Sequence, residues 1–426
     1  MDGSDIVRRP PFGDNPLVGE RGATTRRRIL AAALDVFAEH GFHDTRVELI
    51  TEAAGCSRPA FYQYFASKDE VFWHLAGRLA REMDAVAEHL RDIPGGEDGL
   101  APVQEWIRGM IDLQESYAPI FASFEAASRE QASERQSSRG INTHIGEALI
   151  DVAGASHRDL DRHEIAGAIA TTLLRTIHYY RLGLGQLGET RFVDGLSRTV
   201  HRLLHGPVTG VNVQPVKRPP KRRAPAWPDF PGLDSSGDDL RPRGRMTRQR
   251  LLDAGARVLP QRGFHDTRVD DIVDVAGVSH GSFYRYFSNK DELFHVLAEQ
   301  AARRMVDLVQ TFPENPAGPE LVQWLSIWFR EYRENGGVIS EWQEIGQDDP
   351  ELSEFSLAIA VVLFDRLDRI VHGRDFGDSS VDALVLLSVI ERLPYTVLAL
   401  EYLDDDDAVA ASAFLIRRGI LGHVDG

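Results

Sequence analysis

The chain repeats part of its own sequence at an offset of 222 residues, and this repeat limits the possible folds more than any other feature. Residues 25–76 align with residues 247–298 without a gap, and 27 of the 52 positions are identical. Solenoid repeats recur every ~20–50 residues, so an offset of this length indicates that a whole domain was duplicated. The 426 residues are long enough for two to four domains of ordinary size. We therefore expect two successive modules with the same fold.

The segments that follow each repeated copy have the apolar pattern of helices. Apolar residues recur there at spacings of three and four, which is typical of an amphipathic helix, and the alternation of a strand is missing. The predicted helices are 103–117, 160–185, 190–205, 319–334, 355–372, 380–403 and 408–421. The sequence therefore predicts an all-α fold.

A proline-rich stretch at residues 206–243 separates the two modules. Its eight prolines and its basic cluster, Lys217 to Arg223, predict an extended, semi-rigid linker. Such a cluster is usually solvated, and contact with nucleic acid is the second interpretation. The net charge of −17 does not exclude nucleic acid as a partner, because the acid is concentrated in residues 299–426, which carry 24 acidic and 10 basic side chains.

The cellular compartment is indicated by what the sequence lacks. Cys56 is the only cysteine, which excludes an internal disulfide and is typical of a reducing compartment. No apolar run approaches the ~18–20 residues that span a bilayer, and the N-terminus does not have the shape of a signal peptide. We therefore expect a cytoplasmic protein with no membrane partner.

Each copy of the repeat carries the pattern of a helix-turn-helix. In the first copy a helix ends at Gly41, and the spacing Thr45-x-x-Glu48 predicts a capping box for a second helix. Ser57 then caps a short third helix at 58–65. The equivalent residues of the second copy are Gly263, Thr267, Asp270, Ser279 and the helix 280–287. Two short helices joined by an Ala-Gly-x-Ser turn, behind a longer helix, form a helix-turn-helix.

Periodicity divides the third helix into two faces. Phe61 and Phe65 lie four residues apart and are expected to anchor the helix, as are Phe283 and Phe287. The opposite face combines hydroxyl groups, a basic side chain and an amide. Such groups can bind phosphates and the edges of nucleobases in the major groove. The members of this face are Arg58, Pro59, Tyr62 and Gln63 in the first copy and His280, Gly281, Tyr284 and Arg285 in the second. A generic helical corner with solvated polar residues is the alternative, and the recurrence of the pattern disfavours it.

These residues resemble the signature of a known family. The string Ala54-Gly55-Cys56-Ser57-x-x-x-Phe61-Tyr62-x-Tyr64-Phe65-x-Ser67-Lys68-Asp69-Glu70-Val71 resembles that of TetR-family repressors, and residues 276–293 resemble it as well. The resemblance implies a ligand-responsive transcription regulator, most simply a repressor released by its effector. In this family the first three helices bind DNA, helices five to eight enclose a ligand pocket, and the last two dimerise.

The resemblance divides the chain into six parts. They are a flexible N-terminal arm (1–22), a first helix-turn-helix domain (23–83), a first helical regulatory domain (84–205), the linker (206–243), a second helix-turn-helix domain (244–304) and a second regulatory domain (305–424). Ordinary family members are homodimers of single-copy chains. Here the last helices of both modules belong to one polypeptide, so we expect an intramolecular pseudo-dimer, with further self-association left open.

The resemblance also assigns DNA contacts residue by residue. Thr45 and Thr267 match the phosphate-contacting cap of the second helix, and Lys68 and Lys290 match a lysine that sits against phosphate. Tyrosine hydroxyls on the third helix meet the DNA backbone in the family. The full set of expected DNA-binding residues is Thr45, Arg46, Ser57, Arg58, Pro59, Tyr62, Gln63, Tyr64 and Lys68, with Thr267, Arg268, Ser279, His280, Gly281, Ser282, Tyr284, Arg285, Tyr286 and Lys290.

The two copies differ at the positions that face the bases. Gln63 in the first copy is Arg285 in the second, and Arg58 is His280. Glutamine favours the N6/N7 edge of adenine, whereas arginine favours O6/N7 of guanine. We therefore predict an asymmetric operator with two unlike half-sites. Drift at positions that never touch bases is the alternative.

Effector chemistry is the weakest signal in the sequence. Aromatic residues recur at helical spacing in both modules, which is more often a core than a pocket wall. If they line pockets, the effector is apolar. The candidate ligand-binding residues are Trp106, Met110, Tyr117, Phe121, His178, Trp328, Tyr332, Trp342 and Arg392. Arg392 can pair with a ligand carboxylate or with Glu391 or Glu401 on its own helix, and we favour the intrahelical pairing.

Two rival classes of function were weighed against a DNA-binding regulator. The His43-Asp44 pair lies in the turn before a helix, where an aspartate more often serves the helix than a reaction. No nucleophile elbow, phosphate loop or metal-ligand spacing is present, so we expect no enzyme, no catalytic or metal site and no cofactor. The alternative is a ligand sensor or protein-interaction module in which one or both DNA-binding units no longer function.

Overall fold

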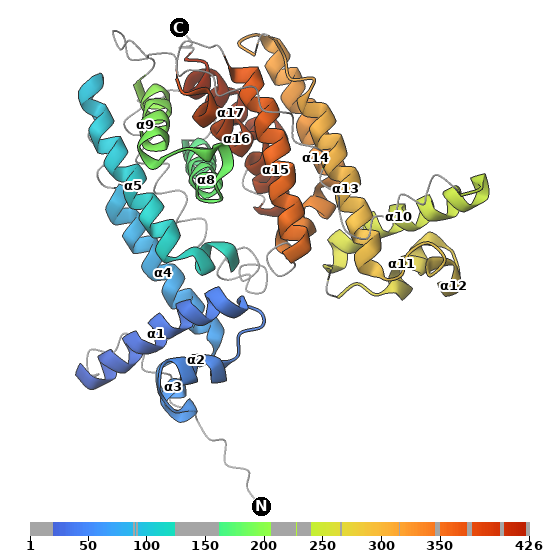
Figure 1. Ribbon diagram of the computed structural model, residues 1–426, viewed down its shortest axis with the longest axis horizontal. Coiled ribbons are helices and arrows are strands. Elements are labelled where there is room, and N and C mark those ends of the chain that lie inside the picture. The colour runs from blue at the N-terminus through green and yellow to red at the C-terminus, as the bar shows by residue number, and fades with distance from the viewer. Residues whose placement is uncertain are drawn as a thin grey trace, which may run out of the picture. The chain divides into compact units, whose positions relative to one another are not determined.

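The computed structural model describes residues 20–87, 90, 93–123, 162–205, 227, 240–264, 266–314, 316–345, 350–372, 377–400 and 404–422. Over these residues the chain is helical and contains no β-strand, which confirms the predicted all-α class (Figure 1). None of the described helices is long and apolar enough to cross a membrane. Nearly all of the predicted N-terminal arm and most of the predicted linker lie outside the described residues.

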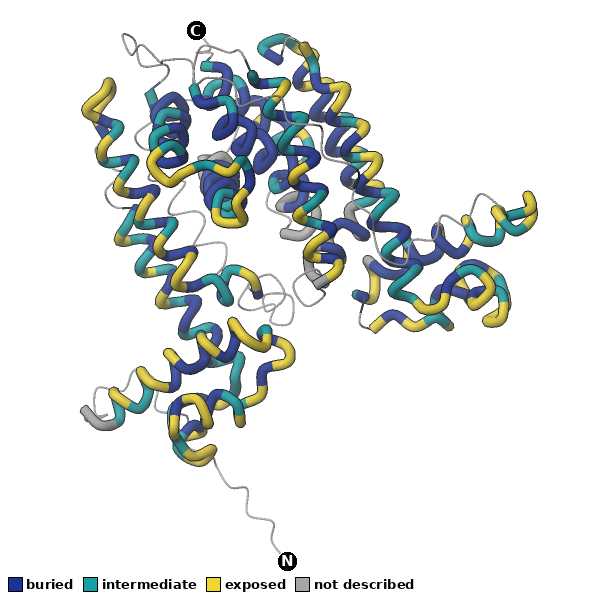
Figure 2. The backbone as a smooth tube through the Cα atoms, viewed as in Figure 1, coloured by how far each residue is buried: buried dark blue, intermediate teal, exposed yellow. Residues whose placement is uncertain are grey.

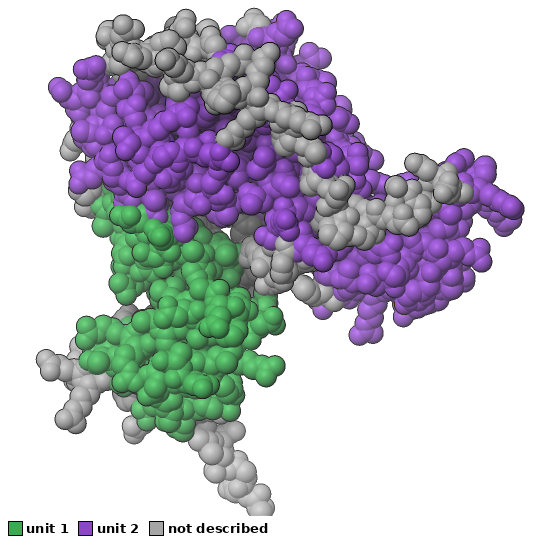
Figure 3. Space-filling model, viewed as in Figure 1, with its two compact units in different colours: residues 1–86, 112–141 green, residues 87–111, 142–426 purple. Residues whose placement is uncertain are grey.

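The chain forms two compact units, one of residues 1–86 and 112–141 and one of residues 87–111 and 142–426 (Figure 3). The first unit contains α1 (Glu20–His40), α2 (Val47–Ala53), α3 (Arg58–Tyr64) and most of α4 (Lys68–Ala87). α1 ends at Gly41, whose φ of 73° is the left-handed conformation that favours glycine after a helix. Phe37, Phe42 and Phe72 form the aromatic core of this unit, with ring centroids 4.8–6.2 Å apart.

The second unit contains the second helix-turn-helix. Its elements are α10 (Pro242–Arg262), α11 (Val269–Ala276), α12 (His280–Phe283) and α13 (Lys290–Val309). α12 is shorter than the predicted helix 280–287, because it ends after Phe283 and continues as a turn. The second position of this helix is Gly281, whereas α3 has Pro59 there. Proline near the start of a helix already has the helical φ, whereas ordering glycine costs more entropy. This difference accounts for the shorter α12.

The predicted caps of the second helix are corrected by the structure. Thr45 does not cap α2, because Arg46 precedes the helix and the Thr45 hydroxyl donates to the Gly41 backbone oxygen at 2.6 Å. Thr267 donates in the same way to Gly263 at 2.7 Å. Ser57, by contrast, caps α3 as predicted, since its hydroxyl accepts the Ala60 N–H at 3.3 Å. The short Thr side chain is thus used to close the preceding turn.

The remaining helices of the second unit come from both modules. The first module contributes the start of α5 (Leu100–Ser116), the 3₁₀ turn η2 (Glu97–Gly99), α8 (Arg162–Arg181), the turn η3 (Leu184–Gln186) and α9 (Glu189–His205). The second contributes α14 (Pro319–Ile345), α15 (Pro350–Val371), α16 (Ser379–Leu400), α17 (Asp405–Phe414) and a π-helical turn, η4 (Leu415–Ile420). α14 continues past the predicted end at residue 334, because Ile339 and Trp342 are buried on it.

α16 lies at the centre of this unit. Every residue from Ser380 to Glu391 is buried, and the helix packs against α8, α9, α14, α15 and α17 (Figure 2). α8 and α9 therefore pack on a helix of the other module, and for this reason the compact units do not follow the module boundaries.

A proline inside α16 is compensated by a tryptophan from α14. Pro394 has no N–H, so it cannot make the helical hydrogen bond to the backbone oxygen of Ile390. The Trp328 indole N–H donates to that oxygen at 2.6 Å instead. Trp328 is 2% exposed, so the bond lies in the core. The helix can therefore keep a buried proline without leaving a buried carbonyl unsatisfied.

Candidate nucleic-acid interface

An arginine from the first helix of each copy holds the helix-turn-helix turn. Arg28 donates from Nε to the Ala54 backbone oxygen at 3.1 Å and from Nη2 to that of Gly55 at 2.9 Å. Arg250 donates to the equivalent oxygens of Ala276 and Gly277 at 2.5 and 3.1 Å. Gly55 and Gly277 have φ values of 58° and 60°, so the turn needs glycine. Sequence reasoning missed these arginines, although their identity in both copies was a visible signal.

In the first copy, α3 presents the predicted polar face to solvent. Phe61 and Phe65 are fully buried, whereas Tyr62 is 44% exposed and Gln63 is exposed beside it. Arg58 is exposed as well and pairs with Glu48 of α2, with Nη1 and Oε1 2.8 Å apart. The two faces that periodicity predicted are therefore present, and the polar face is open.

The second copy keeps this arrangement with different side chains. Tyr284 is 54% exposed and Arg285 is exposed, while Phe283 is fully buried. His280 Nε2 lies 2.7 Å from a carboxylate oxygen of Asp270 on α11. Because His280 and Asp270 occupy the positions of Arg58 and Glu48, both copies hold the start of the third helix against the second helix by a base–acid pair.

The lysines at the start of the fourth helix are held by the protein itself. Lys68 Nζ donates to the backbone oxygens of Phe42 and His43 at 2.6 and 2.7 Å. Lys290 Nζ donates to those of Phe264 and Thr267 at 2.6 and 3.0 Å. Burial lowers the pKa of Lys290 from its ordinary value. Both ammonium groups therefore stabilise the turn before the second helix, a role that sequence reasoning did not assign.

The other predicted DNA-binding residues lie around these two faces. Arg46 and Arg268 are exposed at the start of α2 and α11, while Thr45 and Thr267 are each 2% exposed. Ser279 and Ser282 share a hydrogen bond of 2.9 Å between their hydroxyls at the start of α12. Two of the remaining residues, Pro59 and Gly281, are exposed. The other two, Tyr64 and Tyr286, are half-buried. In each copy part of the predicted set is therefore exposed, whereas the threonine before the second helix is buried.

Comparison with known proteins identifies both of these segments. The family described as bacterial regulatory proteins, tetR family, matches residues 29–75 and again residues 251–297. The chain carries two tetR-family domains in tandem.

Curated relatives also match part of the chain. An uncharacterized HTH-type transcriptional regulator of Bacillus subtilis, YdgC, is 44% identical over 55 residues, which is 13% of this chain and 28% of that protein. The HTH-type transcriptional regulator RutR of Escherichia coli is 34% identical over 92 residues (22% and 42%). The HTH-type transcriptional repressor AcnR of Corynebacterium glutamicum is 34% identical over 99 residues (23% and 47%). The matches thus span less than half the length of these relatives.

A solved structure also aligns with part of the chain. A crystal structure of a TetR-family transcriptional regulator from Syntrophomonas wolfei aligns with 41% of this chain and 96% of its own, at 14% identity and a TM-score of 0.35.

Behind the second tetR-family domain, the predicted ligand-binding aromatics are part of the helical core. Trp328, Tyr332 and Trp342 are 2%, 2% and 6% exposed. Trp342 donates its indole N–H to the Ser356 hydroxyl at 2.5 Å, and Trp328 is bound to Ile390 as described above. Burial raises the pKa of Tyr332 well above its ordinary value. These side chains therefore pack the helices that follow the second helix-turn-helix.

The ligand-binding candidates of the first module fall in both compact units. Trp106 and Met110 are 1% and 0% exposed in the second unit. In the first unit, Phe121 is half-buried and Tyr117 is buried, with its hydroxyl donating to Glu82 at 3.0 Å. Burial, aided by the adjacent Glu82, raises the pKa of Tyr117 to about 12.

Two ionisable candidates, His178 and Arg392, lie on α8 and α16. Burial, together with nearby arginines, lowers the pKa of His178 to about 3. The Arg392 guanidinium lies 4.6 Å from the ring centroid of Tyr395 on the same helix. Glu391, one of its two predicted partners, accepts hydrogen bonds from Arg175 of α8, and Glu401 lies outside the described residues.

A cavity of about 440 Å³ lies between the end of α13 and α15. It is lined by Val309, Gln310, Val362, Asp365, Arg366, Arg369 and Ile370, and none of the predicted ligand-binding residues is among them. The described residues contain no group of histidine, cysteine and carboxylate side chains that could hold a metal ion.

Proposed function

We propose that the chain is a transcriptional regulator that binds double-stranded operator DNA with both helix-turn-helix units. The observation that carries this proposal is the exposed polar face that recurs on both third helices, with Tyr62 and Gln63 in one and Tyr284 and Arg285 in the other. RutR and AcnR, which match 22% and 23% of this chain, are HTH-type regulators, and AcnR is a repressor. Repression is therefore the proposed direction of control, and the cytoplasm is the proposed place of action.

One chain supplies both DNA-binding units in this proposal. α8 and α9 of the first module pack against α16, α17 and the terminal turn of the second. Within this bundle the Thr176 hydroxyl of α8 donates to the Ser388 hydroxyl of α16 at 3.0 Å. This packing supports an intramolecular pseudo-dimer, which takes the place of the usual pair of identical chains.

The proposed DNA contacts follow from exposure. Arg46 and Arg268 are free of the core and are proposed to meet phosphate or base, and the exposed tyrosines to meet the backbone. Four of the predicted residues already bind the turn before the second helix in the free protein: Lys68, Lys290, Thr45 and Thr267. Their proposed part in phosphate binding is therefore secondary to this structural role.

The proposed operator is asymmetric. A homodimer presents two identical recognition helices, so its half-sites mirror each other. In this chain the exposed side chains at equivalent positions differ, with Gln63 against Arg285, and each good bidentate contact discriminates bases by ~1–3 kcal/mol. Two unlike half-sites would fix the orientation of the chain on the duplex.

A small apolar effector is the proposed signal. The Trp106 indole N–H and the Tyr332 hydroxyl are buried and have no hydrogen-bond partner among the described residues. Buried polar groups are nearly always bonded, so these two atoms support a ligand with an acceptor group in each helical module. A ligand that binds one conformation more tightly than another shifts the population and with it the affinity for DNA.

Selection of binding sites from random duplex DNA by the full chain tests the proposal. We expect two unlike half-motifs at a fixed spacing, bound by one chain of 47.5 kDa per duplex. Affinity should fall steeply with added salt, because each neutralised phosphate releases counterions. Enrichment of a symmetric palindrome contradicts the asymmetric operator, and no enrichment at all contradicts DNA binding.

Two reciprocal variants assign the half-motifs. Gln63→Arg makes this position identical in the two copies, so the two half-motifs should become more alike at one base pair. Arg285→Gln should change the other half-motif and leave the first intact. If both variants alter the same half-motif, or neither alters any, these side chains do not read bases.

A further inference from the structure

The contact between the two modules has a symmetric framework. Arg202 of α9 donates from Nε to the Gly419 backbone oxygen at 2.7 Å, and Arg418 donates in return to that of Leu204 at 3.0 Å. Thr176 and Ser388 meet at the contact of α8 with α16. We take Thr176 and Ser388 as equivalent positions, so that residue i of α8 corresponds to residue i + 212 of α16. Arg202 then corresponds to Arg418, and the backbone oxygens that they bind correspond to within one residue. An isologous interface repeats every contact in this way.

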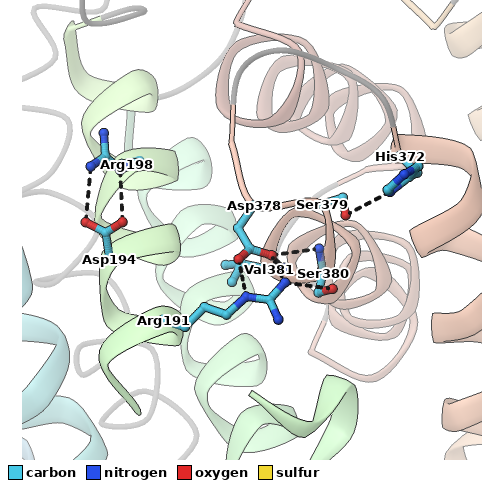
Figure 4. Close-up of polar contacts among 8 residues, drawn as sticks. All are labelled: Arg191, Asp194, Arg198, His372, Asp378, Ser379, Ser380 and Val381. Atoms are coloured by element: carbon cyan, nitrogen blue, oxygen red, sulfur yellow. Dashed lines mark hydrogen bonds and ion pairs between the residues drawn. The ribbon is translucent and has the colours of Figure 1, made fainter. Parts of the chain in front are cut away.

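The charges on this framework are one-sided. Among the residues that the structure describes, three ion pairs join the modules, and in each the arginine comes from the first module and the carboxylate from the second. They are Arg175–Glu391 (Nη2 to Oε1, 2.5 Å), Arg191–Asp378 (Nη2 to Oδ1, 2.9 Å) and Arg202–Asp382 (Nη2 to Oδ1, 2.8 Å). Figure 4 shows Arg191 of α9 reaching Asp378 at the start of α16.

The corresponding positions do not repeat these pairs. The counterpart of Glu391 is Tyr179 and that of Asp382 is Ala170. Two first modules placed together would therefore leave Arg175 and Arg202 without a carboxylate. Removing one partner of a buried ion pair is strongly destabilising, because the other charge stays buried and uncompensated.

Two second modules placed together would also leave a buried charge without a partner. The counterpart of Arg175 is Leu387, so each Glu391 would face an aliphatic side chain in place of an arginine. Asp382 would keep an arginine, since Arg418 stands at the position of Arg202. Glu391 has only 10% of its side chain exposed, so water does not compensate the loss.

From this one-sided pattern we infer that the bundle is an interface for unlike modules, in which α8 and α9 of the first module accept the acidic face of α16 and reject a second copy of themselves. The inference rests on the proposed pseudo-dimer and extends it to the choice of partner. Each first module therefore pairs with a second module and not with another first module. Such selectivity places one unit of each kind in every pair.

Charge reversal in the full chain tests the selectivity. Arg175→Glu gives a chain with acid on both faces, and Glu391→Arg gives a chain with base on both faces. Neither should pair its own modules, but the mixture offers complementary faces at both interfaces. Sedimentation should therefore show a complex of twice 47.5 kDa only when the two variants are mixed.

Arg198→Glu is the matched control. Arg198 also lies on the first module and pairs with Asp194 of its own helix at 3.1 Å (Figure 4). Its side chain is about as exposed as that of Arg175, 24% against 25%. This variant should keep the mass of a single chain, alone or mixed with Glu391→Arg. A mixture of the two reversed chains that stays at single-chain mass overturns the inference, as does either variant that associates with itself as strongly as the mixture does.

A single variant that does not fold loses its helical circular dichroism. In that case the double variant Arg175→Glu/Glu391→Arg, in which the two charges are exchanged, tests the inference. Recovery of the helical signal at single-chain mass supports the inference, and failure to recover contradicts it. The proposed function has its own readout, because an unmodified chain that sediments only as a two-chain complex contradicts the pseudo-dimer. Charge-dependent mixing can succeed or fail independently of that result.

Discussion

Replacing Trp328 with phenylalanine removes the donor that compensates for Pro394. The Ile390 backbone oxygen would be left buried without a partner, since Pro394 has no N–H and the indole bond of 2.6 Å is gone. An unsatisfied buried carbonyl costs ~1–3 kcal/mol. The smaller ring leaves a cavity that adds about 1 kcal/mol. We therefore expect Trp328→Phe to lower the free energy of unfolding by about 2–4 kcal/mol.

Trp324→Phe is the matched control for this experiment. Trp324 lies one turn earlier on α14 and stacks on Trp328, with ring centroids 5.2 Å apart. Its N–H lies 3.3 Å from the Leu308 backbone oxygen, which also accepts from the Thr311 N–H and hydroxyl at 2.9 and 2.8 Å. No carbonyl is orphaned when this indole is removed, so only the cavity term of about 1 kcal/mol remains.

Pro394→Ala supplies the missing backbone N–H and should rescue the tryptophan variant. In that background Trp328→Phe should cost about 1–2 kcal/mol less than in the unmodified chain, because the Ile390 oxygen regains a helical donor. Urea unfolding followed by circular dichroism measures all four chains of the cycle. Equal costs for Trp328→Phe and Trp324→Phe, or no rescue by Pro394→Ala, would refute the compensation.

Three further perturbations test the packing and the electrostatics. The folded pKa of His178, about 3, lies below its unfolded value near 6.5, so its contribution to stability is complete above pH 6.5 and is lost as pH falls toward 3. His178→Gln should flatten the fall in unfolding free energy measured between pH 6.5 and 5.5; an unchanged slope contradicts this. A Cβ at Gly195 would lie 2.6 Å from Val381 of α16, so Gly195→Ala should cost ~1–3 kcal/mol in a thermal melt, whereas Gly167→Ala, which meets nothing within 4 Å, should be neutral or stabilising. Lys290→Met should destabilise the second helix-turn-helix by ~1–2 kcal/mol, seen as faster amide hydrogen exchange in α11, because two backbone oxygens lose a charged donor; unchanged exchange would leave the lysine without this structural role.

Local patterns predicted the helix-turn-helix units well. The spacing of Phe61 and Phe65 predicted the buried face of α3, and both are fully buried. Ser57 was predicted as a cap and acts as one. Thr45 was also predicted as a cap and is not, since a backbone oxygen four residues earlier competes for its hydroxyl. Contacts between residues a few positions apart leave a signature in the sequence, but competition between two local partners does not.

The sequence by itself determined the duplication, the helical class and the two unlike polar faces, because each depends on spacing within one helix or on the comparison of two equivalent segments. Only the tertiary structure decided which helices meet. Arg175 and Glu391 lie 216 positions apart, and Trp328 lies 62 positions from the Ile390 oxygen that it satisfies. No periodicity connects such residues; their partnership exists only once α8 and α14 pack against α16, where the low polarity of the core makes each unpaired charge and carbonyl costly.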